Sequence, residues 1–412
     1  ILIQALLRSW ARERPLLLIL EDAHWLDSAS WELTIQTTRS LSVTQTPFFI
    51  LIITRTPDEY SSASQSIAAL QQIGGYAHLE LGDLSPDEIV TLVTQQFQLE
   101  ANGLPQEVVN LVQQRSGGNP FFARELAFNL VEQGTLQIEP INETANRCQI
   151  MSDLTHEHEL PTTIQGLILA RIDRLPPEHQ LTLKVAAVIG RTFTYRLLVH
   201  TLGRETAVIA AALKSHLQTL EQKELTALDV PEPDLIYIFK HIISQEVAYD
   251  TLLFAQRRQL HHRVAIWYET TFSTPEARAP YYPLLAHHYH FAEEAEQELH
   301  YAKLTANQAA NQYANETAVT YYSRALELET DEPEQYELYR QRELIYDRIG
   351  ERESQLADVE AMLTLADRLN DNEKRATALL RKANYYMVVS TYDLAETAVD
   401  QTITLAQTIQ NH

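Results

Sequence analysis

Two short apolar runs occur near the start of the chain, and polar residues end each of them. Residues Leu16 to Leu20 are all apolar and are followed at once by Glu21 and Asp22, and a second run covers Phe48 to Ile53. Between the two runs, Ser28 to Ser42 has apolar positions at helical spacing. Short apolar runs that alternate with helices predict buried parallel strands joined by crossover connections.

The pattern changes from mixed to helical near residue 85. A third, weaker strand is predicted over Ala77 to Leu81, and Ser85-Pro86-Asp87-Glu88 is typical of a helix start, with proline at the first helical position and acids in the first turn. Helical patterns then continue to Gln133-Gly134. Residues 136–160 are polar and irregular, so we expect a linker or long loop there.

Residues 161–275 have the outline of a winged helix, which is three helices followed by a β-hairpin. A long helix is then expected, through Tyr249, Leu253, Leu260 and Val264. The three helices and two hairpin strands are predicted over Thr163 to Arg174, Glu178 to Ile189, Thr206 to Gln222, Thr226 to Asp229 and Leu235 to Phe239.

Helical periodicity is nearly unbroken beyond Tyr281. Three similar segments, Ala318 to Leu328, Leu356 to Ala366 and Leu394 to Leu405, recur at about 38 residues, close to the helix pairs of tetratricopeptide arrays, which have about 34. Ala325 lies where such repeats need a small residue for close helix packing. A plain helical bundle is the alternative.

Charge and composition exclude some classes of function. The formal net charge is -23, from 32 basic and 55 acidic residues, and such a field repels phosphate backbones, which argues against general nucleic-acid binding. No uncharged apolar run reaches the length of a membrane span. The single cysteine, Cys148, excludes an intrachain disulfide framework and fits a reducing compartment.

The acids after the first apolar run are the best candidates for chemistry. Acidic residues at the carboxyl end of a buried parallel strand lie where α/β sheets bind ligands, and in P-loop enzymes an acid there holds Mg²⁺ while a neighbour polarises the attacking water. The alternative for Glu21 and Asp22 is a strand that simply ends in polar residues. Asp27 is better interpreted as a helix N-cap than as a ligand.

The segment Glu21-Asp-Ala-His-Trp-Leu-Asp27 resembles the Walker B segment of STAND ATPases, the signalling ATPases found fused to nucleotide cyclases, kinases and transcription activators. The resemblance extends over nearly the whole chain in five blocks that follow one another in the family's order. The other four blocks are Ser116-Gly-Gly-Asn-Pro-Phe-Phe-Ala-Arg-Glu125, Gln165-Gly-Leu-Ile-Leu-Ala-Arg-Ile-Asp-Arg-Leu175, Val185-Ala-Ala-Val-Ile-Gly-Arg-Thr-Phe193 and Phe239-Lys-His-Ile-Ile-Ser-Gln-Glu-Val-Ala-Tyr249.

By this resemblance, Glu21 and Asp22 are the Mg²⁺-binding and water-activating pair, although many members of the family carry Asp first. Arg55 matches the sensor position that contacts the terminal phosphate, and its alternative is a solvated loop arginine. Pro120 matches the proline that packs against adenine, and its alternative, compatible with that role, is a helix start. His241 matches a histidine placed against the bound diphosphate, and a structural histidine is the alternative.

The phosphate-binding loop of such an enzyme, Gly-x-x-x-x-Gly-Lys-Ser/Thr, is not in this sequence. None of the seven lysines follows a glycine. Because the chain begins at Ile1 rather than Met, and helical patterns run into both ends, we expect an internal fragment whose P-loop lies upstream of Ile1. Such a fragment alone should bind ATP weakly or not at all. The histidines at 261, 262, 287, 288 and 290 are better interpreted as helix-surface residues than as a metal site.

The expected fold class is α/β, a partial P-loop NTPase core, followed by mostly α. The expected function is an ATP/ADP-dependent switch, with Mg²⁺, that regulates a fused effector, most simply a nucleotide cyclase; alternatives are part of a transcription activator with a DNA-binding domain beyond His412, a kinase-linked module, or a non-hydrolysing scaffold. Hydrolysis and simple exchange are not distinguished. The expected partners are a protein or small molecule on the repeats and the fused effector, with an oligomer on activation, in the cytoplasm and without membrane or direct nucleic-acid contact. The domains are residues 1–82 (core), 83–135 (helical lid), 136–160 (linker), 161–275 (winged helix) and 281–412 (repeats).

Overall fold

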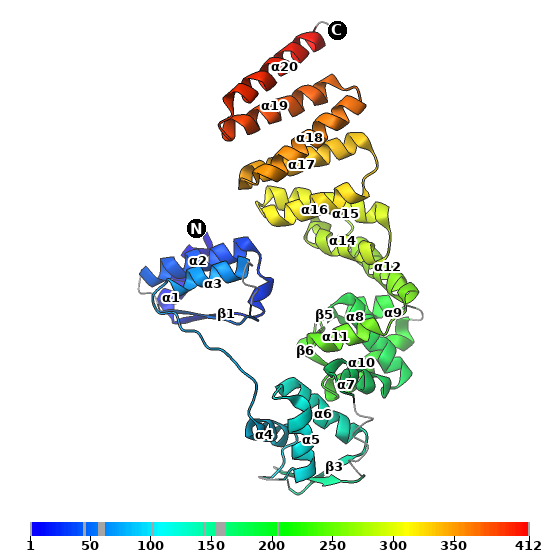
Figure 1. Ribbon diagram of the computed structural model, residues 1–412. Coiled ribbons are helices and arrows are strands. Elements are labelled where there is room, and N and C mark those ends of the chain that lie inside the picture. Colours follow the sequence, from blue (N-terminus) through cyan, green and yellow to red (C-terminus); the bar gives the residue numbers. More distant parts are fainter. Residues whose placement is uncertain are drawn as a thin grey trace. The chain divides into compact units, whose positions relative to one another are not determined.

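The computed structural model gives the chain as a series of small, mostly helical parts (Figure 1). Contacts divide it into two compact units, one of Ile1–Glu80 with Leu299–His412 and the other of Leu81–Glu298, and we describe each part by itself. The structure describes residues 2–43, 47–56, 62–100, 103–142, 145–152, 161–203 and 206–410.

The first part of the chain contains the two predicted parallel strands. Strands β1 and β2 pair in parallel, with register from Leu16↔Phe48 to Leu20↔Ile52, and a helix lies between them in the sequence. The parallel pair with a helical crossover is therefore confirmed, while its assignment to a P-loop core stays a prediction. The elements here are α1 (Leu2–Glu13), β1 (Leu16–Leu20), η1 (Ala23–Trp25), α2 (Ser28–Val43), β2 (Phe48–Ile52) and α3 (Ser62–Gln71).

Only one face of this two-stranded sheet is covered. Helices α2 and α3 contribute a small core that contains Trp31, Ile35 and Leu70. The other sheet face leaves Leu17 56% and Phe49 62% exposed. The prediction of strands buried on both faces is therefore wrong for the described residues, because apolar composition alone does not show whether a second layer is present.

The predicted third strand over Ala77 to Leu81 is also wrong. The structure assigns no strand there, and Leu79 and Leu81 are 82% and 85% exposed. A strand needs a hydrogen-bonded neighbour, and within the described residues this segment has no ladder partner, so its apolar alternation does not produce a strand.

Residues 84–152 form a helical part with its own core. The predicted start at Ser85 is confirmed by a capping box with Glu88. The expected linker is wrong over most of its described residues, because residues 136–140 and 146–150 pair as antiparallel strands, and Leu136 and Cys148 join the helical core. Residues 143–144 and 153–160 lie outside the described part. The elements are α4 (Pro86–Gln96), α5 (Gln106–Ser116), α6 (Pro120–Glu132), β3 (Leu136–Pro140) and β4 (Asn146–Ile150).

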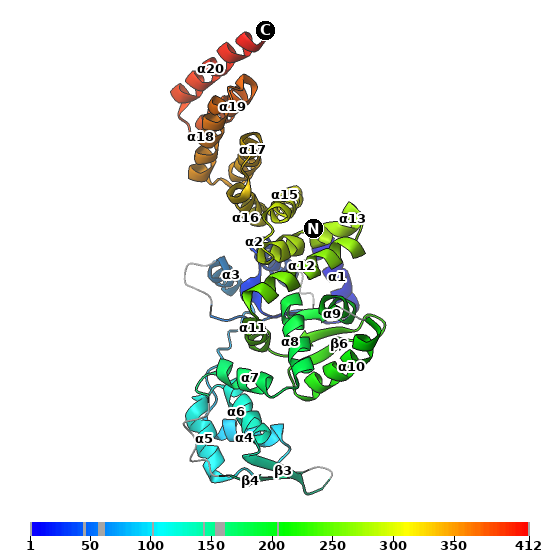
Figure 2. The same ribbon diagram turned by 90° about the vertical axis from the view of Figure 1, so that its right-hand side faces the viewer.

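The next part combines helices with a three-stranded antiparallel sheet of order β5-β7-β6 (Figure 2). The three predicted helices and the hairpin are present, and the sequence patterns missed β5 and α9. The predicted long helix is broken at residues 251–253, and Leu253 is the N-cap of a second helix. The winged-helix interpretation stays a prediction. The elements are α7 (Ile164–Asp173), α8 (Pro177–Ile189), β5 (Thr192–Thr194), α9 (Tyr195–Leu202), α10 (Thr206–Gln222), β6 (Thr226–Val230), β7 (Ile236–Phe239), α11 (Ile242–Asp250), α12 (Phe254–Thr271), α13 (Pro275–Arg278), η3 (Ala279–Tyr281) and α14 (Tyr282–Phe291).

The C-terminal part is a row of long helices in which successive helices pack against one another (Figure 1). Ala318 and Ala325 are fully buried in a core that contains residues of α15, α16 and α17, as expected for small residues at close helix contacts. Among the described residues, no helix is both long and apolar enough to cross a membrane. The helices are α15 (Ala295–Asn311), α16 (Asn315–Leu328), α17 (Glu332–Ile349), α18 (Arg352–Arg368), α19 (Asn372–Val388) and α20 (Tyr392–Gln410).

A buried network of charges joins α17, α18 and α19. Glu343 is 0% exposed and accepts hydrogen bonds from Arg381 Nε at 2.6 Å and Nη2 at 2.8 Å, and from Gln355 Nε2 at 2.8 Å. Arg381 also reaches Asp347 Oδ2 at 2.9 Å, and Arg352 reaches Asp347 Oδ1 at 2.8 Å. These contacts fix the packing register of three successive helices.

Candidate functional site

The candidate acids lie at the carboxyl end of the parallel strands. Leu20 O accepts from Ile53 N at 2.8 Å, and Ile53 O accepts from Ala23 N at 2.9 Å. These backbone bonds hold Glu21 and Asp22, between Leu20 and Ala23, beside the segment that leads from β2 to Arg55. The structure thus brings the three residues to the same edge of the sheet, the edge at which such sheets bind ligands.

Asp22 and Asp27, which both follow β1, differ in their surroundings. Asp22 has φ 51° and ψ 38°, a left-handed conformation that asparagine and aspartate tolerate better than most residues. It ends the strand and leaves the Glu21 and Asp22 side chains exposed. Asp27 Oδ1 accepts from Ser30 N at 2.6 Å, which confirms that Asp27 caps a helix.

The residues at this edge suit a hard divalent cation. Mg²⁺ binds in proteins through one or two carboxylates and keeps water or phosphate oxygens as its other ligands. Glu21 and Asp22 supply two adjacent, exposed carboxylates, which fits that donor set. Among the described residues no group of three or more His, Cys, Asp or Glu is placed to hold a metal by itself, so a cation here would need ligands from outside the group.

The other two predicted residues, Pro120 and His241, lie near the start of α6. Asn119 Oδ1 accepts from Phe122 N at 2.9 Å, and Pro120 occupies the first turn, so the helix-start interpretation of Pro120 holds. Its ring remains exposed. The next residue, Phe121, contacts His241, with ring centroids 4.2 Å apart. Pro120 and His241, 121 positions apart in the sequence, therefore lie at one place in the fold.

Positive charge surrounds His241. Arg124 and Lys240 both pair with Glu224, at 3.0 Å and 3.3 Å. Burial lowers the pKa of His241, and the charges of Arg124 and Lys240 lower it further, with Glu224 acting in the opposite direction. The imidazole is therefore neutral near pH 7, in surroundings that favour an anion.

A buried ion pair, which the sequence patterns did not predict, fixes α6 against α7. Arg171 is 3% and Glu125 5% exposed, and Arg171 Nη1 donates to Glu125 Oε2 at 2.5 Å. The Arg171 guanidinium also lies over the Phe128 ring, 5.0 Å from its centroid. Both charged residues lie in the sequence blocks that resemble STAND ATPases, but only the fold shows that they pair across two helices.

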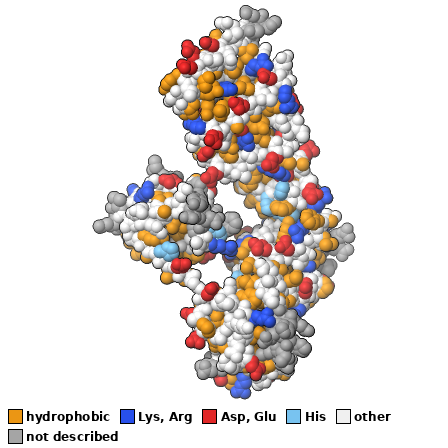
Figure 3. All heavy atoms as spheres, viewed as in Figure 1, with side chains coloured by type: hydrophobic (Ala, Val, Ile, Leu, Met, Phe, Trp, Pro, Cys, Tyr) orange, Lys and Arg blue, Asp and Glu red, His pale blue; other side chains and the backbone are white. Residues whose placement is uncertain are grey.

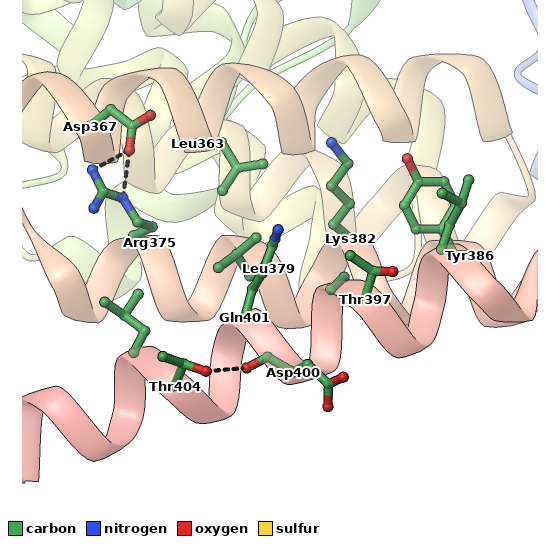
Figure 4. A pocket seen from close by; sticks show the side chains of 13 residues that line it. Leu363, Asp367, Arg375, Leu379, Lys382, Tyr386, Thr397, Asp400, Gln401 and Thr404 are labelled. Atoms are coloured by element: carbon green, nitrogen blue, oxygen red, sulfur yellow. Dashed lines mark hydrogen bonds and ion pairs between the residues drawn. The ribbon is translucent and has the colours of Figure 1, made fainter.

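The helical repeats carry an open groove of about 910 Å³ between α18 and α20, with α19 as its floor (Figure 4). Leu363, Leu379 and Leu394 supply apolar surface. At one end Arg375 Nε donates to Asp367 Oδ1 at 2.5 Å, and farther along Lys382 lies near Tyr386, 6.0 Å from its ring centroid. Figure 3 shows hydrophobic side chains interspersed with charged ones on this part of the chain.

The predicted site residues thus fall into two groups. Glu21, Asp22 and Arg55 share the sheet edge in one unit, and in the other unit His241 contacts Phe121, the neighbour of Pro120 in the sequence. Sequence reasoning missed Phe121 and Arg124, which connect the second group. Phe121 was visible inside the Gly-Asn-Pro-Phe-Phe block, but its contact with residue 241 depends on the fold.

Comparisons with known proteins give weak and partial similarity. No family model matches the chain. It is 23% identical over 233 residues to "Adenylate cyclase type 10" of Rattus norvegicus, covering 49% of this chain and 14% of that protein. The human protein of that name is 23% identical over 235 residues, with the same coverage. An uncharacterized protein of Rhizobium meliloti is 26% identical over 271 residues, covering 63% of this chain and 23% of that protein.

The chain therefore matches only a minor part of these relatives. Among solved structures, it is similar to a Signal Transduction ATPase with Numerous Domains (STAND) protein with a tetratricopeptide repeat sensor from Pyrococcus horikoshii. That match has 12% identity and a TM-score of 0.41, and covers 99% of this chain and 71% of the other. A TM-score of this size does not establish a shared fold.

Proposed function

We propose that this chain is part of an ATP- or ADP-dependent signalling switch that regulates a fused effector, most simply a nucleotide cyclase. The observation that carries the proposal is the placing of Glu21, Asp22 and Arg55 at the carboxyl edge of parallel strands. The partial similarity to adenylate cyclase type 10 supports the choice of effector.

In this proposal each residue has one task. A bound Mg-nucleotide supplies the phosphate charge that the switch senses. Glu21 and Asp22 would hold the cation and orient water, and Arg55 would contact the terminal phosphate. Pro120 would offer a rigid apolar face to the base, and His241 would donate a hydrogen bond to a phosphate oxygen near the positive charge of Arg124.

The repeats would supply the input to the switch. A ligand in the groove between α18 and α20 can act only by binding one conformation more tightly than another. We propose that this ligand is a protein segment or small molecule that favours exchange of ADP for ATP.

The proposal is tested by titration calorimetry with Mg-ATP and Mg-ADP, on this chain and on a version extended by about 150 residues upstream of Ile1, a length on the scale of one domain. We expect tight binding by the extended version only. Asp22→Asn should weaken Mg-dependent binding at least about tenfold. Asp27→Asn is the matched control, because asparagine caps helices as well as aspartate does and should leave binding unchanged.

No binding by either version would overturn the nucleotide assignment and leave a helical-repeat scaffold as the better description. Equal loss in the two aspartate variants would show that the acids act through stability and not through the cation.

A further inference from the structure

A separate cavity lies where the C-terminal end of α8 meets α11, α12 and α14. Its volume is about 390 Å³, which is within the usual range of small-molecule pockets, about 300 to 1,000 Å³. Val188, Ile189 and Leu284 line it with aliphatic groups, and Tyr249, His261 and Phe291 with rings. All of these residues belong to the unit of Leu81–Glu298. Figure 3 shows histidine side chains at the surface near α14.

A chain of hydrogen bonds leads from the interior to this cavity. His288 Nδ1 lies 2.8 Å from His261 Nδ1, and His261 Nε2 lies 3.1 Å from the Tyr249 hydroxyl. His261 and His288 are each 1% exposed, so the interpretation of these two histidines as helix-surface residues is wrong. Within the described part of the chain, His288 Nε2 is buried and has no hydrogen-bond partner.

The buried His288 determines in which direction these hydrogen bonds are donated. If His261 donated to His288, the single N–H of neutral His288 would be on Nε2, where no acceptor is available. Buried N–H groups without an acceptor are rarer in proteins than under-satisfied acceptors. The favoured arrangement therefore has His288 donating to His261 and His261 Nε2 donating to the Tyr249 oxygen. The Tyr249 hydroxyl proton is then directed elsewhere, and Tyr249 lines the cavity.

The side chains that line the cavity are uncharged near pH 7. Burial lowers the pKa of His261 to about 3 and lowers the pKa of His287, so neither carries charge near pH 7. Burial raises the pKa of Tyr249, whose ring is covered on one side by the Arg257 guanidinium, 4.4 Å from its centroid. The hydroxyl therefore keeps its proton. Neutral imidazoles and aliphatic walls do not favour an anion, and the described residues form no metal-binding group.

The shape of the ring wall favours a flat molecule. The His261 and Phe291 rings are stacked, with centroids 5.1 Å apart and planes 23° apart, and Ile189 and Leu284 supply aliphatic walls of the same cavity. The stacked pair is one aromatic wall of the cavity, and aromatic rings pack well against such a wall, edge to face or offset.

We propose that this cavity binds a small, uncharged, planar heteroaromatic molecule that accepts a hydrogen bond from Tyr249. The site is separate from the proposed nucleotide residues, because His241 and Tyr249 lie at opposite ends of α11, about 12 Å apart along the helix. Failure of nucleotide binding would leave this proposal unaffected.

The test uses quinoline, which accepts but does not donate a hydrogen bond, and indole, which donates through its N–H. Saturation-transfer NMR at pH 8 on the intact chain should show quinoline bound, with Kd on the order of 1 mM for a molecule of about ten heavy atoms. Tyr249→Phe removes only the hydroxyl and should weaken quinoline about tenfold while leaving indole unchanged. Leu284→Trp fills the cavity and should abolish both signals.

Leu181→Trp is the matched control, because Leu181 is on α8 but 51% exposed and is not among the lining residues. It should leave both probes bound. Absence of quinoline binding to the unaltered chain would overturn the proposal, and so would binding that survives Leu284→Trp. Equal effects of Tyr249→Phe on the two probes would overturn the donor role of Tyr249.

Discussion

The buried charge network of the repeats allows a quantitative prediction for Glu343→Ala. Glu343 is fully buried, and its carboxylate accepts from Arg381 and Gln355. The substitution leaves Gln355 without an acceptor and Arg381 with Asp347 alone. Removal of one partner of a buried pair costs about 3 to 5 kcal/mol. Because the Arg381 side chain is 21% exposed and keeps one carboxylate, we expect the lower end, about 3 kcal/mol.

Hydrogen exchange read by mass spectrometry is the suitable assay, because it reports the opening of single helices. A loss of about 3 kcal/mol should accelerate exchange in α17, α18 and α19 about a hundredfold. Glu360→Ala is the control on α18, since Glu360 is 59% exposed and lies 3.9 Å from Lys382. An exposed pair of this kind contributes less than about 1 kcal/mol.

A second substitution should restore the lost stability. Replacing both members, as Glu343→Leu with Arg381→Met, removes the buried charge as well as its partner and should restore much of the lost protection, since Asp347 keeps Arg352 at 2.8 Å. If Glu343→Ala accelerated exchange no more than Glu360→Ala, the magnitude worked from burial would be refuted. If the double variant exchanged as fast as Glu343→Ala, the unpaired charge of Arg381 would not be the cause of the destabilisation.

Three further outcomes are expected. Gly118→Ala should destabilise the α4–α6 part by about 1 to 3 kcal/mol in urea unfolding, because φ of Gly118 is +87° and an added Cβ would lie 2.6 Å from Asp83 Cβ. Gly134→Ala is the control and should cost less, because Gly134 also has positive φ but open space around it. Equal losses in the two variants would show that the clash with Asp83 does not matter. The pKa of His261 is lowered from 6.5 to about 3, so between these pH values the imidazole is protonated in the unfolded chain and neutral in the folded one. The free energy of unfolding should therefore fall by about 1.4 kcal/mol for each pH unit from 6.5 towards 3. In urea titrations at several pH values His261→Phe should make this slope shallower, and an unchanged slope would exclude His261 as its source. Asp27→Ala should cost about 1 kcal/mol through loss of the cap of α2, measured by thermal unfolding against the neutral Asp27→Asn.

The sequence was sufficient where a pattern is local. The apolar run from Leu16 to Leu20, the cap at Ser85 and the small residue at Ala325 each depend on near neighbours, and the structure has each as expected. Local patterns failed where a distant partner decides. Ala77 to Leu81 alternates like a strand but has no strand to pair with among the described residues. Residues 136–140 and 146–150 form a hairpin, and its Leu136 is buried in the α4–α6 core.

The candidate site shows the same division. Glu21 and Asp22 could be placed at the end of a strand from the sequence, because the strand itself is local. The contact of Phe121 with His241 could not, because it joins residues on different elements and depends on how α6 packs. The pairing of Arg171 with Glu125 is hidden for the same reason, since nothing in a sequence distinguishes a buried charge from an exposed one.

The uncovered face of the first sheet has a practical consequence. Leu17, Ile19, Phe49 and Leu51 form a flat apolar surface on two short strands, and each strand has an unpaired edge among the described residues. Such a surface is a template for self-association. When this chain is produced by itself, we expect these side chains to cause aggregation despite the net charge of -23. Mild detergent or the substitution Phe49→Lys should therefore improve the recovery of soluble protein more than a change of salt concentration.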